Sequence, residues 1–171
     1  MALKHGESAV VDLVLVSENE EGNKTVQVRI RDQKIPEIGD KFTSRHGQKG
    51  VIGLILNESD VPFTTSGITP DIMFSPHGVP SRMTISHLIE LIAGKTGALS
   101  GRYIDGTTFD SEPQEKIRKE LLELGFKEDG TEMMINPKTG EQMQARIYVG
   151  SMYYLRLKHM VSNKMHSRAL G

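Results

Sequence analysis

Residues 39–50 read Gly39-Asp40-Lys41-Phe42-Thr43-Ser44-Arg45-His46-Gly47-Gln48-Lys49-Gly50. Four basic or titratable side chains stand among three glycines here, and a single acid interrupts them. Glycine permits positive φ and lets a ligand approach the main chain. Cations at this density favour an anion, above all a phosphate held by side-chain charge and backbone amides. The alternative is a solvated turn with surface lysines, and this stretch alone leaves both interpretations open.

The charge of the chain is balanced overall but uneven along its length. The 171 residues include 21 basic and 22 acidic side chains, so the total charge does not indicate a polyanionic partner. Residues 142–171 contain no acid, whereas residues 105–132 hold nine acids against four bases. The neutral average therefore conceals a basic glycine loop, an acidic middle and a basic C-terminal stretch.

Size and composition favour a soluble intracellular protein. The length fits one domain, or one domain with an appendage. Without cysteine the chain has neither disulfides nor thiolate metal sites, which suits a reducing compartment. No apolar run approaches the roughly 20 residues that cross a bilayer, and the N-terminus lacks the apolar core of a signal peptide. We therefore expect no membrane partner.

Several β elements are expected. Residues 10–16 and 24–30 predict a hairpin, because apolar β-branched residues flank a polar turn. The glycine loop, residues 39–50, is expected to lead into a short buried strand over residues 51–56. A second hairpin is expected from residues 133–135 and 142–149, around a turn that contains proline and glycine.

Three helices are predicted from apolar residues at helical spacing. The first begins near Ile85 and ends at Gly94, where a left-handed C-cap belongs. The second has Ser111 as its N-cap and Gly125 as its stop. The third covers the C-terminal stretch around residues 153–161. The expected class is thus mixed α and β (α+β), with a β-rich core and about three helices.

Two motifs near the first helix have competing interpretations. Gly94-Lys95-Thr96 is no phosphate loop, because Ile89 occupies the position where the Walker pattern requires glycine. Lys95 is then expected to be a favourable cation at a helix C-terminus. Arg82 precedes the helix, and a cation at the positive helix end suggests that an anion completes the site. A surface arginine without a role fits equally well.

The expected last helix would carry a basic polar face. Its basic and titratable residues are Arg156, Lys158, His159, Lys164, His166 and Arg168. A solvated face is the simplest interpretation, but exposed helices usually mix both signs of charge. His159 and His166 would share a face, yet two histidines without a nearby carboxylate or cysteine make a poor metal site. The sequence also offers no nucleophile or general base, so it predicts either nucleic-acid binding or a contribution to another chain's active site.

Four motifs in this order resemble the second-largest subunit of multisubunit DNA-directed RNA polymerase. They are residues 39–50, 60–64 (Asp-Val-Pro-Phe-Thr), 76–84 (Pro-His-Gly-Val-Pro-Ser-Arg-Met-Thr) and 158–168 (Lys-His-Met-Val-Ser-Asn-Lys-Met-His-Ser-Arg). The resemblance runs from about Val10 to the end. His77, Thr84 and the segment 93–99 are similar to the archaeal or eukaryotic type rather than the bacterial one.

The resemblance implies a place in the fold of that subunit. Residues 1–34 would end a flap-like or wall-like hairpin region, and residues 35–171 would form the later part of the hybrid-binding domain. The family's double-psi β-barrel would be present only in part. Family subunits are several times longer, so we expect a fragment that depends on its partners. It would not be active as an isolated chain.

The resemblance also assigns roles to individual residues. Lys41 and Lys49 match two lysines near the RNA 3′ end and the initiating or incoming nucleotide. Arg82 matches an arginine that contacts the triphosphate, and His159 matches a histidine near the priming nucleotide. Other residues lie in matched motifs without an assigned role: Arg45, His46, Lys164, His166 and Arg168. Ser162-Asn163 departs from the family, which usually has acidic residues there.

The implied chemistry is shared with other chains. The catalytic aspartates of this family belong to the largest subunit, so this segment would bind no cofactor or metal itself, and Mg²⁺ would act in the assembled enzyme. The expected partners are the largest subunit, the other core subunits, template DNA, nascent RNA and nucleoside triphosphates, in the cytoplasm of an archaeon or a nucleus. Two alternatives are a free-standing RNA-binding module and a scaffold whose basic surface meets an acidic subunit.

Overall fold

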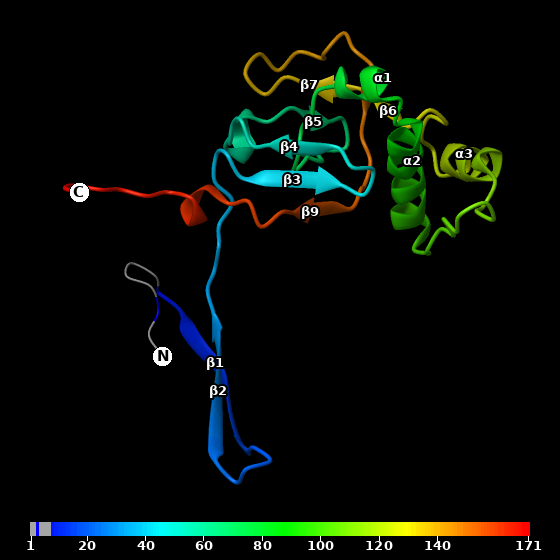
Figure 1. Cartoon of the computed structure of the whole chain (residues 1–171). Helices are drawn as coiled ribbons and strands as arrows, with labels where there is room; N and C mark the ends of the chain where they lie inside the picture. The colour runs from blue at the N-terminus through cyan, green and yellow to red at the C-terminus, as the bar shows by residue number, and fades with distance from the viewer. Residues whose placement is uncertain (1–2, 4–7) are drawn as a thin grey trace. The chain divides into compact units, whose positions relative to one another are not determined.

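The computed structural model describes residue 3 and residues 8–171, and the chain divides into two compact units, residues 1–36 and 37–171. The first unit is an antiparallel hairpin of β1 (Val10–Glu18) and β2 (Lys24–Arg31), as predicted (Figure 1). Its apolar side chains are exposed on both faces of β1, since successive strand residues point to opposite sides. Strands that are apolar on both faces are typical of sheets covered on both sides.

A three-stranded antiparallel sheet organises the second unit. Its order is β4 (Lys49–Val51), β3 (Lys41–Ser44) and β9 (Tyr154–Arg156), as Figure 1 shows. Residues 39–50 are therefore a tight hairpin and not a loop. The strand expected over residues 51–56 is also wrong, because pairing stops after Ile52, whose backbone exchanges hydrogen bonds with Gly39 (2.8 Å) and Asp40 (3.0 Å).

The C-terminal stretch is a strand where a helix was predicted. Residues 154–156 pair with β3, and Leu157 N donates to Lys41 O at 2.9 Å. The free edge of β3 supplies these backbone partners, and tyrosine at positions 153 and 154 favours extended structure. A short 3₁₀ helix, η2 (Val161–Asn163), follows the strand. His159 and His166 consequently share no helix face.

Two smaller sheets and a further 3₁₀ helix complete the β structure. The pairs are β5 (Phe63–Thr64) with β7 (Met134–Ile135) and β6 (Thr131–Glu132) with β8 (Ile147–Tyr148), and η1 covers Glu58–Asp60. The second predicted hairpin is right only near its turn. There Asn136 N donates to Glu141 O at 2.9 Å and Met143 N donates to Met134 O at 2.8 Å.

The helices are α1 (Gly78–Arg82), α2 (Ile85–Ser100) and α3 (Gln114–Glu123). The left-handed residue Met83, with φ 53°, separates α1 from α2. Helix α2 continues past Gly94 to Ser100 and its C-cap is Gly101, so Gly94 is not the C-cap. The segment at Ser151 crosses Gly94 so closely that an added Cβ would lie 2.1 Å from the Ser151 carbonyl oxygen.

Because α2 is longer than predicted, Lys95 lies in its interior and not at its end. Its ammonium group is buried, forms an ion pair with Glu132 and lies 4.5 Å from the centre of the Phe126 ring. The lysine therefore links α2 to β6. A buried ammonium needs such a partner, since an uncompensated charge in the interior is costly.

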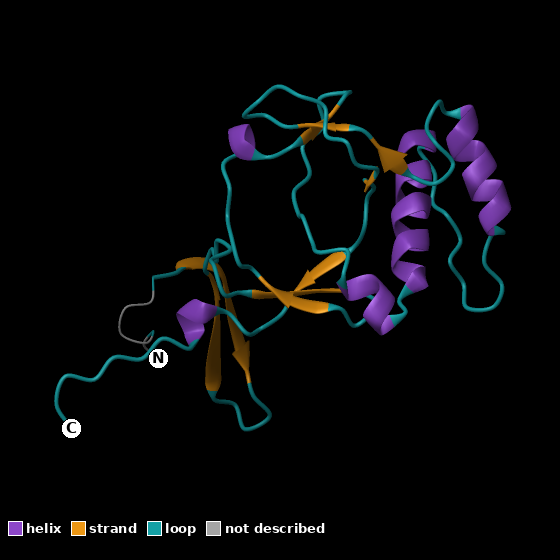
Figure 2. Ribbon diagram, turned by 90° about the horizontal axis from the view of Figure 1, so that it is seen from above, coloured by secondary structure: helices purple, strands orange, loops and turns teal. Residues whose placement is uncertain are grey.

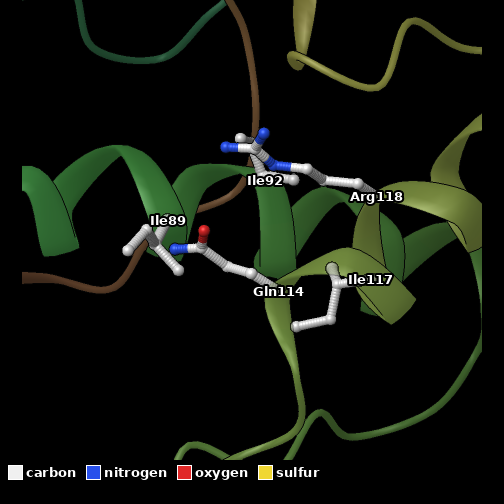
Figure 3. A pocket seen from close by; sticks show the side chains of 5 residues that line it. All are labelled: Ile89, Ile92, Gln114, Ile117 and Arg118. Atoms are coloured by element: carbon white, nitrogen blue, oxygen red, sulfur yellow. The ribbon is translucent and has the colours of Figure 1, made fainter.

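Helices α2 and α3 lie side by side over a small apolar core (Figure 2). Its buried members are Ile92, Ile117 and Leu121. Figure 3 shows the crevice between the helices, which Gln114 and Arg118 border on the α3 side. The N-cap of α3 is Pro113 and not Ser111, whereas the expected stop at Gly125 is confirmed by its φ of 87°.

The mixed α+β class with three helices and small antiparallel sheets is confirmed. The third helix is α1, however, and not the C-terminal stretch. Within the part of the chain that the structure describes, no helix is both long enough and apolar enough to cross a membrane.

Candidate phosphate-binding face

Lys41 and Lys49 lie on the same face of the β3–β4 hairpin. In the register Lys41 is opposite Val51, and Thr43 is opposite Lys49. Directly opposed residues of an antiparallel pair share a face, as do residues two apart, so the two lysines are diagonal neighbours about 7–8 Å apart. Neither lysine side chain has an ion pair or hydrogen bond to any described residue. The hairpin thus presents two uncompensated cations together.

The opposite face of the same sheet has a structural role. Phe42 is opposite Arg156, and the Arg156 guanidinium lies 6.0 Å from the centre of the Phe42 ring. Arg156 also donates to the buried carboxylate of Asp40 at 2.6 Å. The side chains on this face therefore hold β9 against β3, and the lysine side chains on the other face take no part in these contacts.

Asp40 connects the start of the hairpin to the C-terminal stretch. Its carboxylate accepts hydrogen bonds from the backbone N–H groups of Val161 (2.9 Å) and Glu37 (3.1 Å), besides the one from Arg156. The Val161 hydrogen bond is the largest influence on the pKa of Asp40. With the Glu37 and Arg156 hydrogen bonds it outweighs burial and lowers that pKa. The single acid of the glycine-rich stretch is thus a structural anchor.

Arg82 contacts the turn of the hairpin through Gln48. The Nη1 group of Arg82 donates to Gln48 Oε1 at 2.5 Å, which brings α1 to the β3–β4 turn. Because arginine only donates, the amide oxygen faces it, and the Gln48 NH₂ group keeps its donor capacity. Arg82 is the last residue of α1 and is followed by Met83 and Thr84 before α2 begins. Arg82 therefore precedes the N-terminus of α2, as predicted, but it also ends the short helix α1, where a cation is favourable, so the helix-dipole argument for an anion is weakened.

His159 lies beside Lys41 through the backbone. Lys41 N donates to the His159 carbonyl oxygen at 3.3 Å, and the His159 side chain is exposed. The structure thus brings Arg82 to the hairpin turn and His159 to the start of β3. The three basic residues after η2, Lys164, His166 and Arg168, are exposed in the tail that ends the chain, red in Figure 1. In the described residues no contact ties them to the hairpin.

Glu90 on α2 holds Arg45 and His46, although no sequence motif pointed to it. Arg45 Nε donates to Glu90 Oε1 at 3.1 Å, His46 Nε2 contacts Oε2, and Tyr153 N donates to Oε1 at 3.3 Å. Burial acts to raise the pKa of Glu90, but the hydrogen bonds from Arg45 and His46 outweigh it and lower that pKa. The available sequence signal was that Glu90 is the only acid in α2.

The turn residues Arg45 and His46 are therefore already engaged. The Arg45 guanidinium also lies 5.3 Å from the centre of the Tyr153 ring. His46 donates from Nε2, since a carboxylate only accepts, and its Nδ1 lies 3.1 Å from Ser86 Oγ. These contacts fix the turn that precedes Lys49. Arg45 and His46 are thus paired with Glu90, unlike Lys41 and Lys49, although the Arg45 side chain is 59% exposed.

His87, next to this network, is a buried imidazole. Its ring stacks on Phe74 at 4.9 Å and lies 5.4 Å from the His46 ring. Burial, assisted by His46, lowers the pKa of His87. Neither ring nitrogen has a hydrogen-bond partner among the described residues. The ring packs against Phe74 and His46 without an internal hydrogen bond.

The described residues include no group of three or more histidine, aspartate or glutamate side chains arranged to hold a metal ion. The carboxylates of Asp40 and Glu90 are both occupied by hydrogen bonds from the protein. The cationic side chains at the hairpin suit the binding of an anion.

Lysine side chains without internal partners are a common means of binding phosphate. The family comparison is more specific. Residues 1–171 match the family described as RNA polymerase Rpb2, domain 6, and the chain belongs to this family. The resemblance drawn from the four motifs is thereby confirmed.

The relatives include both archaeal and eukaryotic proteins. The chain is 51% identical over 168 residues to DNA-directed RNA polymerase subunit Rpo2 of Saccharolobus solfataricus, covering 98% of this chain and 15% of that protein. It is 48% identical over 169 residues to DNA-directed RNA polymerase II subunit RPB2 of Schizosaccharomyces pombe, covering 99% of this chain and 14% of that protein. The chain thus spans about one seventh of the length of these relatives.

Proposed function

We propose that this chain is the part of a DNA-directed RNA polymerase core that holds the RNA 3′ end, the RNA–DNA hybrid and the incoming nucleoside triphosphate. Family membership supports the polymerase assignment. The pairing of Lys41 and Lys49 on one face of the hairpin carries the assignment to phosphate. Two cations without internal partners on a rigid hairpin are suited to two successive phosphates of a nucleic acid backbone.

Each side chain has a distinct task in this proposal. Lys41 and Lys49 neutralise phosphates at the RNA 3′ end, where the flexible lysine stem follows a moving backbone. Arg82 binds the triphosphate, because the planar guanidinium can donate two parallel hydrogen bonds to phosphate oxygens. Gln48 holds Arg82 on one side and offers its NH₂ group to the same anion. His159 faces the priming nucleotide.

The chemical step itself requires another chain. Phosphoryl transfer depends on neutralising the reacting and leaving oxygens, which metal ions and cationic side chains share between them. Because the described residues hold no suitable carboxylate set, the Mg²⁺ ions belong to the largest subunit in this proposal. The segment orients substrate and product, with template DNA and the other core subunits as partners.

Nucleotide addition by the assembled enzyme tests the proposal. In a core enzyme reconstituted with Arg82→Ala, we expect the KM for nucleoside triphosphate to rise about tenfold or more, with a smaller change in kcat, since the variant cannot form a charge-assisted hydrogen bond to the substrate. Arg82→Lys should recover part of the loss. Arg118→Ala is the matched control, because Arg118 is an exposed arginine on α3. Wild-type rates for Arg82→Ala at limiting nucleotide would refute the assignment of Arg82.

A further inference from the structure

Met83 turns the chain between helices α1 and α2 with a left-handed backbone. Its φ and ψ are 53° and 34°. Among the residues that the structure describes, Phe109 is the only other non-glycine residue with positive φ. In this conformation the Cβ of an L-residue crowds the following carbonyl oxygen, which is why glycine is the usual residue at such a helix end. The conformation of Met83 therefore needs a cause.

The side chain of Met83 does not supply that cause. The residue is 80% exposed, so packing of the side chain cannot hold the backbone in place. Methionine also lacks the short polar group with which asparagine and aspartate stabilise a left-handed backbone. Backbone strain persists only where the surrounding structure enforces it, so the elements on either side of Met83 must do so.

The segment that contains Met83 is closed by a contact between its two ends. The rings of Phe74 and His87 stack with their centres 4.9 Å apart and their planes 8° from parallel, and His87 is buried. The chain must therefore leave Phe74, form α1 and return to the first turn of α2 between residues 74 and 87. Met83 and Thr84 are the two residues between the helices, and only Met83 has positive φ. The reversal of the chain thus falls on Met83.

The β3–β4 hairpin turn also holds the chain on both sides of Met83. Before Met83, Arg82 Nη1 donates to Gln48 Oε1 at 2.5 Å. After it, Ser86 Oγ in the first turn of α2 lies 3.1 Å from His46 Nδ1. His46 and Gln48 belong to the same turn, so one rigid element fixes the chain immediately before and after Met83. These contacts, together with the ring stacking, enforce the left-handed backbone.

Arg82 is the side chain whose direction depends on this reversal. Its only hydrogen bond to the described residues is the one from Nη1 to Gln48. Nε and Nη2 therefore have no partner there, and in the planar guanidinium these two groups donate in parallel from one edge. Such an edge fits two oxygens of one phosphate, provided that the backbone holds it in a fixed direction.

We infer that Met83 is a positioning residue for nucleotide binding, through its left-handed backbone and not through its side chain. By turning the chain directly after Arg82, it keeps Nη1 at Gln48 and presents the remaining guanidinium edge to the triphosphate. The inference rests on the proposed function for the role of Arg82. It adds the residue that orients this side chain, and it requires no contact between the Met83 side chain and the nucleotide.

Two isomeric side chains separate the backbone from the side chain. In the assembled core enzyme, Met83→Ile should raise the KM for nucleoside triphosphate about threefold to tenfold with little change in kcat, because branching at Cβ disfavours the left-handed region. Met83→Leu lacks that branch and should stay close to wild type. Met83→Asn, which removes the apolar side chain but tolerates positive φ, should do the same. A wild-type KM for Met83→Ile, or equal losses in the isoleucine and leucine variants, would overturn the inference.

Coupling to Arg82 distinguishes positioning from a loss of folding. Because Met83 acts through Arg82, Met83→Ile added to Arg82→Ala should leave KM at the value of Arg82→Ala alone. A general loss of folding would instead lower kcat and the yield of assembled enzyme in both backgrounds, which would count against positioning. Additive increases in KM would overturn the inference and leave the proposed function standing. A silent Arg82→Ala variant would overturn the proposed role of Arg82 and the inference together.

Discussion

Asp40 and Arg156, 116 positions apart in the chain, form an ion pair with an N–O distance of 2.6 Å. The carboxylate also accepts a hydrogen bond from the backbone of Val161 at 2.9 Å. Two of the motifs that resemble the polymerase family, the glycine-rich stretch and the C-terminal basic stretch, are therefore parts of one structure. Asp40, the single acid of the glycine-rich stretch, thus joins that stretch to the C-terminal basic stretch through its hydrogen bond from Val161.

The first prediction concerns Asp40→Asn, which keeps the size of the side chain and removes its charge. We expect a lower unfolding midpoint at neutral pH, because the hydrogen bond from Arg156 is weakened and the NH₂ group of the new asparagine faces other donors. The folded pKa of Asp40 is lowered, so its contribution to stability is present above the unfolded pKa of about 4 and disappears as pH falls through the lower folded value. Thermal unfolding from pH 7 to pH 2 measures this.

The difference between wild type and Asp40→Asn is the informative quantity, because other carboxylates with lowered pKa also contribute to the acid dependence. That difference should shrink as pH falls below about 4. A difference that stays constant across the whole range would show that the charge of Asp40 does not stabilise the fold.

The second prediction concerns Glu90→Gln, which weakens the support of the hairpin turn. Glu90 accepts from Arg45, His46 and Tyr153, and glutamine cannot satisfy all these donors. We expect the free energy of unfolding to fall by about 1–3 kcal/mol. Amide hydrogen exchange at residues 45–49 should also become faster. The control is Glu115→Gln on the exposed surface of α3. Unchanged exchange in the turn would mean that Glu90 does not hold it.

Sequence patterns predicted the structure correctly where nearby residues decide it. The nearly unbroken apolar run 10–16 and the alternating residues 24–30 predicted the first hairpin, and Ile117 and Leu121 at helical spacing predicted α3. Both elements bury or pair residues that are close in the sequence. The density of cationic residues identified the glycine-rich stretch as a candidate site. It did not predict which of these residues would lack an ion-pair partner.

The errors arise where distant segments meet. The apolar residues around 153–161 fit a helix by spacing, yet β3 lies more than a hundred positions earlier and takes residues 154–156 as a strand. Glycine at position 94 was expected to end a helix, because a local pattern cannot distinguish a cap from a close approach of Ser151. The role of Glu90 was missed for the same reason, because its hydrogen-bond partners come from two segments distant in the sequence.

The third prediction uses this close approach. Replacing glycine with alanine inside a helix normally stabilises a protein by up to about 1 kcal/mol. At Gly94 the new Cβ would meet the Ser151 carbonyl oxygen at 2.1 Å, and a backbone atom cannot move aside cheaply. We therefore expect Gly94→Ala to lower the free energy of unfolding by about 1–3 kcal/mol. Gly106→Ala is the control, because a Cβ added there would have nothing within 4 Å. Stabilisation by Gly94→Ala would contradict the packing described.

The fourth prediction concerns the lysine face itself. Removing one lysine–phosphate interaction reduces the steepness of the dependence of log K on log salt by about 0.7 for a single strand and 0.9 for a duplex. In the assembled enzyme, Lys49→Ala should therefore release short RNA faster and show a shallower salt dependence of RNA retention. Lys41→Ala should do the same, because both lysines are on one face of the hairpin. Lys119→Ala, on the exposed side of α3, is the matched control. If the slope for Lys49→Ala equals that of wild type while Lys119→Ala also leaves it unchanged, Lys49 touches no phosphate, and the lysine face has another purpose.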